Sequence, residues 1–511
     1  MKKLLILILS LMLVTTLIAC GGNEDAAETT NAPVDTSEPE ELDAQLMLSD
    51  LKTITVDTSV RHQEIESFGA SGAWWSQIVG VNESTRERVA KLLFDPEEGI
   101  GLNCYRYNIG GGSRDTGANS PSIGDVWRRT YSFKDKNGDY DWSRDEGAVW
   151  FMKKASEYGV DEIVMFVNSP IESLTRNGRT YADTTQSNKS NLPPENYEAF
   201  ANYVLDVAEH FKAEGLPIKF ISPINEPQYT WDYATDNVWG QEGCHYSNSE
   251  IVDILKVFVE KIGERDGLDG VEICAPDGGS WNNDTLQFNL AIMRDKTLGQ
   301  YFTAIDNHSY WTETATKRMF KQQMNKVAPN VKYRESEWCE MTTGRDLSMD
   351  SALTLAETVY EDMTILDCVS WQYWIAVSCY DYRDGLIYTD TNGGSVQVPK
   401  RLWAMGNYSR YIDRGYTRVD CTPAEKRLSV SAYEGTNENG EKEIVLVVVN
   451  KYDKAINIDF AGVDSSVYNR ISVHVTDKSH SLSRTYYAEF LDTTAITISA
   501  QSVTTIVISS K

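Results

Sequence analysis

Two glutamates stand in sequence contexts that fit acid–base chemistry. Glu226 ends the run Ile221-Ser222-Pro223-Ile224-Asn225-Glu226-Pro227, and Glu337 lies in Tyr333-Arg334-Glu335-Ser336-Glu337-Trp338. Each follows a short, strand-like run and has polar or aromatic neighbours. A pair of carboxyl groups at one site can cleave a glycosidic bond: one donates a proton to the leaving oxygen, and the other attacks the anomeric carbon or activates a water. We therefore predict a site for glycosidic cleavage.

The residues around each glutamate refine this assignment. Asn225 directly precedes Glu226, so its side-chain amide could donate to the sugar 2-hydroxyl. Tyr333, Glu335 and Glu337 share one face of a strand by its two-residue alternation. Glu337 is last in that strand and should reach an open site. Glu335 would then lie one layer deeper, paired with a cation such as Arg106 or Arg334, and it stays the alternative nucleophile.

Strand-like and helical segments alternate between about residues 65 and 410. The helical segments include Glu195–Ala213 and Ser249–Arg265. The expected strands are Ile65–Ala70, Asn103–Asn108, Asp161–Asn168, Ile218–Ile224, Val271–Ala275, Ala304–His308, Val331–Glu337 and Val369–Trp374. Eight such units predict an α/β fold with a (β/α)₈ TIM barrel, whose sites lie at the carboxyl ends of the strands. A doubly wound open sheet is the alternative, but no Gly-rich loop follows the first strand.

The pattern changes after about residue 413. Short, partly alternating runs with turn-rich gaps predict an attached antiparallel β-sandwich. The expected strands are Arg427–Tyr433, Glu443–Asn450, Ala455–Phe460, Ile471–Thr476, Thr493–Ile498 and Ser502–Ser509. An early run at Lys52–Asp57 should pair into this sandwich. We therefore expect a strand of the sandwich in residues 51–64, a catalytic barrel in 65–412 and the rest of the sandwich in 413–511.

The first fifty residues have the pattern of a processing signal and a tether. Lys2 and Lys3 precede an apolar stretch, and Leu17-Ile18-Ala19-Cys20 resembles a bacterial lipobox, so we expect a signal peptide at 1–20 and lipidation of Cys20. An ordinary secretory signal and a short membrane span are the alternatives. Residues 21–50 hold nine acidic residues, no lysine or arginine and no aromatic residue, which favours a disordered tether. The expected location is the bacterial cell surface, with the membrane as a partner.

The amino-acid composition limits the classes of molecule that the protein is expected to bind. The net charge of −27 argues against nucleic acid and polyanions, whereas a neutral polysaccharide or oligosaccharide fits it. The abundant aromatic side chains suit stacking on sugars, although most of them must fill the core. Apart from Cys20, seven cysteines remain with no CxxC spacing, so at least one thiol is unpaired and a zinc site is not expected. We expect a monomer with no metal or cofactor.

Three motifs together resemble glycoside hydrolase family 30, whose barrel carries a side β-sandwich. They are Asn225-Glu226-Pro227, Ser336-Glu337 and the run Lys400-Arg401-Leu402-Trp403-Ala404-Met405-Gly406-Asn407-Tyr408-Ser409-Arg410-Tyr411-Ile412. The resemblance covers roughly residues 52–511. It implies a retaining double displacement with Glu226 as acid/base and Glu337 as nucleophile.

The resemblance also implies roles for several other residues, each matched to the family at a single position. Arg106 resembles the arginine that steadies the nucleophile, and His308, in Asp306-Asn307-His308-Ser309-Tyr310, resembles a residue that hydrogen-bonds near it. Trp371 or Trp374 resembles the platform under the reacting sugar. Supporting roles are also expected for Tyr310, for Trp231 in a subsite, and for Asn168 in Asn168-Ser169-Pro170.

The substrate is less well defined by the sequence. Three runs look most like the endo-β-1,6-galactanase branch: Phe68-Gly69-Ala70-Ser71-Gly72-Ala73-Trp74-Trp75, Ser222-Pro223-Ile224-Asn225-Glu226-Pro227-Gln228-Tyr229-Thr230-Trp231 and Gln241-Glu242-Gly243-Cys244. The chain departs from the family at Ile171-Glu172, where a bulky aromatic is common, and at Asp413-Arg414-Gly415, where Arg-Pro-Gly is common. The alternatives are a xylanase, a β-glucosidase or glucosylceramidase-like enzyme, and a catalytically inactive glycan-binding lipoprotein. Endo or exo action stays open.

Overall fold

Parallel strands form a barrel in the computed structural model, which describes residues 51–114, 123–135, 137–185, 189–232 and 240–510. Its sheet has the order β6-β5-β4-β3-β2-β10-β9-β8-β7, and every neighbouring pair is parallel. The two outermost strands of this order, β6 and β7, are separated only by Cys274 and Ala275, so they are two pieces of one strand that closes the barrel. The (β/α)₈ barrel predicted from the sequence is therefore confirmed.

The barrel strands lie close to their predicted positions. They are β2 (Ser67–Ser71), β3 (Cys104–Asn108), β4 (Glu162–Phe166), β5 (Ile218–Ser222), β6 (Glu272–Ile273), β7 (Pro276–Gly278), β8 (Ala304–His308), β9 (Lys332–Trp338) and β10 (Cys368–Tyr373). Strands β3, β4 and β10 are buried along their whole length. Such continuous burial is expected of parallel strands that are covered on both faces.

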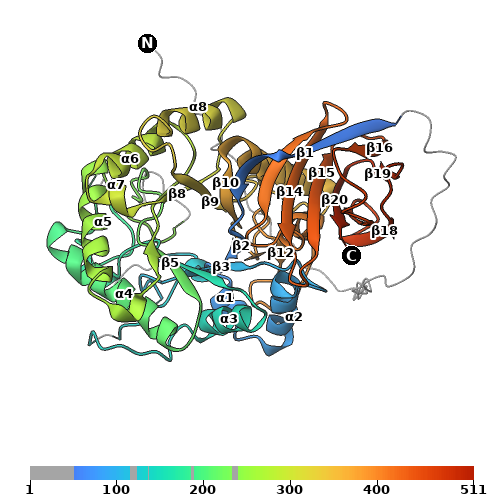
Figure 1. Cartoon of the computed structure of the whole chain (residues 1–511). Coiled ribbons are helices and arrows are strands. Elements are labelled where there is room, and N and C mark those ends of the chain that lie inside the picture. The colour runs from blue at the N-terminus through green and yellow to red at the C-terminus, as the bar shows by residue number, and fades with distance from the viewer. Residues whose placement is uncertain (1–50, 115–122, 136, 186–188, 233–239, 511) are drawn as a thin grey trace, which may run out of the picture. The chain divides into compact units, whose positions relative to one another are not determined.

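Helices alternate with these strands and surround them in Figure 1. They are α1 (Ser76–Val79), α2 (Glu83–Phe94), α3 (Glu146–Glu157), α4 (Tyr197–Ala213), α5 (Asn248–Ile262), α6 (Asn283–Arg294), α7 (Leu298–Tyr301), α8 (Thr314–Met324), α9 (Met349–Glu361) and α10 (Lys400–Ser409). Local sequence fixes their starts. At α5, for example, the Ser247 side chain and the Glu250 side chain form a capping box that satisfies otherwise free backbone N–H groups.

A second, mainly antiparallel sheet of nine strands forms the sandwich. Its order is β18-β17-β20-β15-β14-β13-β1-β16-β19. The strands are β1 (Lys52–Glu64), β13 (Thr417–Thr422), β14 (Leu428–Thr436), β15 (Lys442–Asn450), β16 (Ile456–Ala461), β17 (Arg470–Thr476), β18 (Ser483–Glu489), β19 (Ala495–Ile498) and β20 (Ser502–Ser509). β1, blue in Figure 1, lies between β13 and β16, so the N-terminal strand of the sandwich is confirmed. A further two-stranded sheet pairs β11 (Val377–Ser378) with β12 (Ile387–Tyr388).

Strand β15 joins the sandwich to the barrel. Its residues alternate in the two-residue period of a strand: one set packs into the sandwich interior and the other joins the barrel core. On the barrel side, α9 and α10 pack against this sheet. Asn407 of α10 donates to the Thr505 hydroxyl at 2.9 Å, which ties the helix to β20. Sandwich and barrel therefore share a continuous apolar contact.

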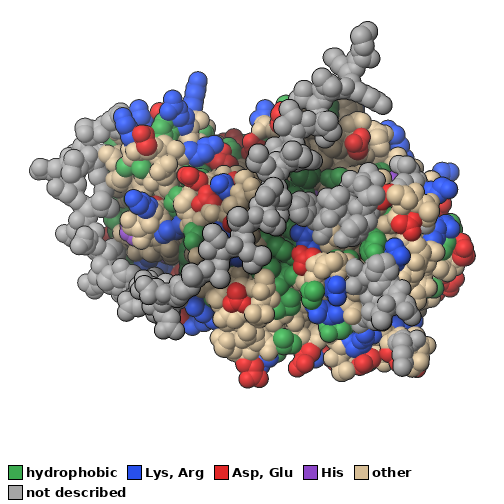
Figure 2. Space-filling model, turned by 180° about the vertical axis from the view of Figure 1, so that it is seen from behind, with side chains coloured by type: hydrophobic (Ala, Val, Ile, Leu, Met, Phe, Trp, Pro, Cys, Tyr) green, Lys and Arg blue, Asp and Glu red, His purple; other side chains and the backbone are tan. Residues whose placement is uncertain are grey.

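The sequence also led to expectations about the cysteines, membrane-spanning segments, surface charge and the N-terminal segment. All seven cysteines in the described ranges are free. Within those ranges, no helix is both long and apolar enough to cross a bilayer. On the face shown in Figure 2, acidic and basic side chains are interspersed among hydrophobic ones. The signal peptide, the lipidation of Cys20 and the acidic tether lie outside the described residues.

Candidate active site

Glu226 lies at the barrel mouth, shortly after β5 ends. Its backbone has a left-handed conformation, with φ of 45°, which is uncommon for a residue with a side chain. Two contacts hold it there: the Glu226 N–H donates to the Asp277 carbonyl at 2.8 Å, and the Trp231 indole donates to the Glu226 carbonyl at 3.1 Å. The Glu226 backbone is thus held in one place at the carboxyl end of its strand.

Glu337 lies near the end of β9 and is 5% exposed. Arg106, at the end of β3, donates from Nη1 to Glu337 Oε2 at 2.6 Å. The Tyr310 hydroxyl donates to Oε1 at 3.0 Å. Burial raises the pKa of the Glu337 carboxyl, and although Arg106 lowers it, the net pKa lies above its usual value. The contacts with Arg106 and Tyr310 favour the ionised form of this carboxyl group.

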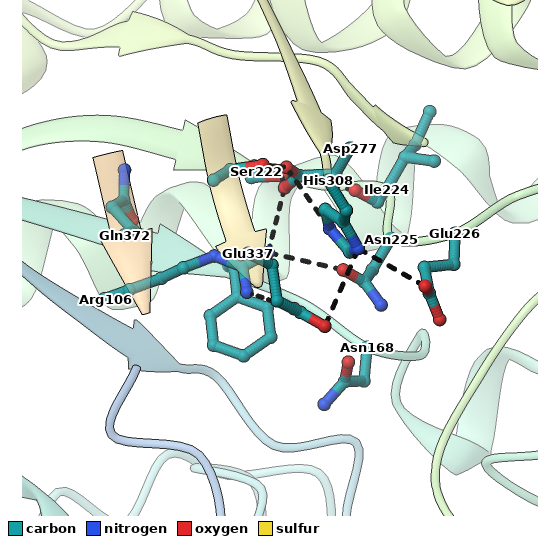
Figure 3. Close-up of polar contacts among 12 residues, drawn as sticks. Arg106, Asn168, Ser222, Ile224, Asn225, Glu226, Asp277, His308, Glu337 and Gln372 are labelled. Carbon is teal, nitrogen blue, oxygen red and sulfur yellow. Dashed lines mark hydrogen bonds and ion pairs between the residues drawn. The ribbon is translucent and has the colours of Figure 1, made fainter. Parts of the chain in front are cut away.

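His308 lies between the two glutamates, as Figure 3 shows. Its Nδ1 is 3.2 Å from Glu226 Oε1 and 3.6 Å from Glu337 Oε1. The imidazole is fully buried, and burial lowers the pKa of His308, which favours the neutral ring near pH 7. Glu226 and Glu337 each place one oxygen within 4.8 Å of the other. Two carboxyl groups so close in a dry site disfavour having both ionised.

Asp277 belongs to this network although the sequence did not single it out. It is 1% exposed, and its Oδ2 accepts from Arg106 Nη2 at 3.1 Å. The hydroxyl groups of Ser222 and Ser336 also donate to it, and His308 Nε2 is 3.7 Å from Oδ1. Burial raises the pKa of Asp277, but Arg106 and His308 outweigh it and the net pKa is lowered. Asp277 therefore balances the charge of Arg106.

The two asparagines and Trp231 differ in their closeness to the carboxyl groups. Asn225 accepts from Arg106 Nη2 through its side-chain oxygen at 3.3 Å, so its amide nitrogen is left for another partner. Asn168 donates to the Asn108 side chain at 3.5 Å and lies below the carboxyl groups in Figure 3. Trp231 is 5% exposed and supports the Glu226 backbone, so its contact is with the loop of Glu226.

The two candidate platform tryptophans are clearly distinguished. Trp371 has no exposed surface, and its indole donates at 3.0 Å to Asp362, the residue directly after α9. It offers no open face to a sugar, so its proposed platform role is wrong. Trp374 follows β10, is 9% exposed and packs edge-on against Trp74 at 5.0 Å between ring centroids. Of the two, only Trp374 is placed to contact a substrate.

Glu335 is buried deeper than Glu337, as its position in the strand predicts, but its partners differ from those expected. It accepts hydrogen bonds from the backbone N–H groups of Glu337 at 2.9 Å and Gln372 at 3.1 Å. Arg106 pairs with Glu337, and Arg334 pairs with Glu66. The predicted pairing of Glu335 with either arginine is therefore wrong. Burial raises the pKa of Glu335 well above its usual value, which favours a neutral carboxyl group.

The same cluster raises the question of a metal ion. Glu226, His308 and Glu337 offer ligand atoms that all lie within 4.8 Å of one another. The Arg106 guanidinium already places a positive charge on Glu337 at 2.6 Å. A divalent cation at the same carboxylate would be repelled by that charge. The donor set therefore fits a metal-independent acid–base pair better than a metal centre.

Comparisons with known proteins identify the family and the fold of this chain. A family model described as O-glycosyl hydrolase family 30 matches residues 51–388. A glucuronoxylanase of Bacillus subtilis is 24% identical over 62% of this chain and 65% of its own length, just under two thirds. An exo-β-1,6-galactobiohydrolase of Bifidobacterium longum is 20% identical over 63% of this chain and 26% of its own. The crystal structure of a conserved exported protein from Bacteroides fragilis is 24% identical, with a TM-score of 0.78 over 89% of this chain and all of that one.

Proposed function

Because the chain belongs to O-glycosyl hydrolase family 30, we propose that it cleaves a β-linked neutral polysaccharide with retention of configuration. One observation carries the proposal: Glu226 and Glu337 place oxygens within 4.8 Å of each other, and Arg106 Nη1 lies 2.6 Å from Glu337 Oε2. Retaining enzymes have carboxyl groups about 5–5.5 Å apart, whereas inverting enzymes leave room for a water at about 6.5–9.5 Å. The close spacing supports direct attack by one carboxylate.

The contacts assign a role to each group. Glu337, ionised beside Arg106 and Tyr310, attacks the anomeric carbon, while Glu226 donates its proton to the departing oxygen. The glycosyl group is then an ester of Glu337. Glu226 next takes a proton from a water, the water attacks the anomeric carbon, and the ester bond breaks. Asn225 has a free amide nitrogen that could donate to the sugar 2-hydroxyl during both steps.

We propose β-1,6-galactan side chains as the substrate. The acidic balance of the chain suits a neutral glycan, and the Bifidobacterium longum relative is named for action on β-1,6-linked galactose. Trp374 supplies an aromatic face near the site, on which a sugar could stack through its C–H groups.

Glucuronoxylan is the second candidate, because an arginine lies among the aromatic residues of this mouth. The Arg128 guanidinium is 4.9 Å from the Trp74 ring and 5.1 Å from the Tyr380 ring, and Trp74 packs on Trp374. An arginine held in this way could bind a uronic acid carboxylate. The Bacillus subtilis relative is named a glucuronoxylanase.

A panel of polysaccharides tests the substrate. We expect wild-type protein to release sugars from β-1,6-galactan, with glucuronoxylan, β-1,6-glucan and an aryl β-glucoside as the other members. Glu313→Gln, which changes an exposed glutamate at the start of α8, is the matched control and should cleave like wild type. Cleavage of glucuronoxylan alone would contradict β-1,6-galactan as the substrate and would leave the proposed reaction mechanism unchanged. Binding of galactan without cleavage would favour the glycan-binding alternative.

Two variants test the roles of the glutamates. Glu337→Gln should lose cleavage of every substrate, because it removes the nucleophile. Glu226→Gln should still react with a dinitrophenyl glycoside, whose leaving group needs no proton, and should accumulate the ester on Glu337. Intact-protein mass spectrometry would then show one added glycosyl group. An inverted first product, observed by NMR, would contradict the double displacement.

We also propose that the protein is held at the bacterial cell surface by a lipid on Cys20. The support is the lipobox-like Leu17-Ile18-Ala19-Cys20 after an apolar stretch, followed by the acidic run of residues 21–50. Metabolic labelling with an alkyne fatty acid should mark the full chain. Cys20→Ala should abolish labelling, and equal labelling of that variant would contradict the proposal.

A further inference from the structure

A cavity of about 680 Å³ opens between the first turns of α5 and α6, next to the loop that carries Glu226. Helices that follow barrel strands begin at the catalytic face, so this cavity opens on the same face as the two glutamates. Its volume lies within the range of about 300–1,000 Å³ that is typical of small-molecule sites. The lining residues are Gln228, His245, Tyr246, Asn248, Asp284 and Gln287, with Ser247, Ser249 and Phe288.

Gln228 connects the cavity with Glu226. A Cβ atom placed on Gly279 would lie 2.3 Å from Gln228 Nε2 and 2.9 Å from Glu226 Oε1, so both groups crowd the same point. Gln228 Oε1 is buried and lacks a hydrogen-bond partner in the described structure. A buried amide oxygen without a partner costs free energy, which a ligand hydroxyl could recover. The cavity thus adjoins the proton donor, whereas Glu337 lies on the far side of His308.

The lining favours a neutral, hydroxyl-rich ligand. Phe288 is 8% exposed and gives the cavity a small aromatic patch, while exposed Asn248, Asp284 and Gln287 give it a polar rim. None of the described lining residues is a lysine or arginine. Asp284 can accept from sugar hydroxyls, and its charge would repel a uronic acid carboxylate. Aromatic surface with a few polar groups is the usual arrangement for binding a sugar ring.

We propose that this cavity binds the leaving-group side of the glycan, and that it selects a neutral sugar there. The inference rests on the proposed function, since the sugar that departs is the one whose oxygen Glu226 protonates. Once the glycosyl ester on Glu337 has formed and the leaving group has departed, the same cavity would hold an acceptor sugar. An acceptor hydroxyl would attack the anomeric carbon of the Glu337 ester, Glu226 would take the hydroxyl proton, and the ester bond would break as the new glycosidic bond forms.

Acceptor transfer gives a direct test. The donors are the 2,4-dinitrophenyl β-glycosides of galactose, xylose and glucose, and phenol release reports the first step. β-1,6-Galactobiose and β-glucuronosyl-1,6-galactose serve as acceptors that differ by one carboxylate. The readout is the ratio of transfer product to hydrolysis product, which does not depend on the rate of the first step. We expect wild-type protein to transfer to galactobiose at least about tenfold better than to the glucuronosyl acceptor, the ratio that about 1.4 kcal/mol produces.

Two tryptophan variants localise the effect. Gln287→Trp fills the cavity from an exposed position of α6 and should lower the ratio for galactobiose by about tenfold or more. Gln322→Trp makes the same change at an exposed position of α8, outside the cavity lining, and should keep the wild-type ratio. Equal ratios for Gln287→Trp and wild type would overturn the inference, as would equal transfer to both acceptors or none to either. No phenol release from any donor would overturn the proposed function and the inference with it.

Discussion

The hydrogen bond from the Tyr310 hydroxyl to Glu337 offers a sharp test of the nucleophile. It spans 3.0 Å, and its two residues are 4% and 5% exposed. A hydrogen bond to a charged group contributes about 1.5–3 kcal/mol. Tyr310→Phe removes the donor with almost no change of shape. Because the donor stabilises the ionised carboxylate, its loss raises the pKa of Glu337 further, and the variant needs a higher pH to ionise its nucleophile.

The assay is the pH dependence of kcat/KM, whose acid limb reports the ionisation of an essential base in the free enzyme. We expect this limb to move to higher pH in Tyr310→Phe. On the acid side of the profile, kcat/KM should fall by about ten- to a hundredfold, which is the rate equivalent of the lost hydrogen bond. Arg106, His308 and Glu226, the other groups that face Glu337, are unchanged in this variant.

Tyr373→Phe is the matched control. Tyr373 is a fully buried tyrosine of β10 whose hydroxyl donates to the Arg383 carbonyl at 3.4 Å, so the same atom is removed without a contact to either glutamate. Its acid limb should coincide with that of wild type. If the acid limb of Tyr310→Phe also stayed at the wild-type pH, Glu337 would not be the base that titrates there, and the assignment of the nucleophile would fail.

Three further changes have expected outcomes. Gly279→Ala would place a Cβ 2.9 Å from Glu226 Oε1 and should lower kcat by up to about a hundredfold. Gly394→Ala is the control, because its Cβ would lie 3.4 Å from the nearest atom, and it should keep the wild-type kcat. Equal kcat values for the two variants would contradict the crowding at Glu226. The buried Glu242 carboxylate accepts hydrogen bonds from the Gly111 N–H and the Thr130 hydroxyl. Glu242→Gln replaces one of the accepting oxygens with an amide group and should lower the free energy of unfolding by roughly 1–3 kcal/mol in denaturant titrations. An unchanged midpoint of unfolding would refute this expectation. Dialysis against EDTA should leave kcat unchanged, and a loss that Ca²⁺ or Zn²⁺ restores would show a metal role.

The barrel strands could be predicted because each is a short apolar run bounded by polar or turn residues. The sandwich strands that were missed lack that signal. β18 (Ser483–Glu489) has no buried residue, and β13 (Thr417–Thr422) is buried only in its first half. β1 continues to Glu64, well beyond the predicted Asp57, through an exposed polar half that pairs with β13 across irregular register. In these strands, pairing with neighbours in space decides the structure, and one sequence does not display such pairing.

The site shows the same division between local and long-range information. Glu226 and Glu337 stand at strand ends, which the local pattern reveals. Asp277 lies two residues beyond the end of the predicted strand Val271–Ala275, and its importance comes from Arg106, Ser222 and Ser336 on three other strands. Trp371 failed as a platform for a related reason. Every residue of β10 is buried, so alternation along that strand could not separate an open face from a closed one.

The distribution of contacts distinguishes two chemically identical side chains in the way that the proposed double displacement requires. His308 touches both carboxyl groups at similar distances, so it cannot by itself decide which of them holds a proton. Arg106 and Tyr310 contact Glu337. Asp277 balances the charge of Arg106, so the local charge favours one ionised glutamate rather than two. In the double displacement that we propose, these contacts favour the ionised form at Glu337 and leave Glu226 to act as the proton donor.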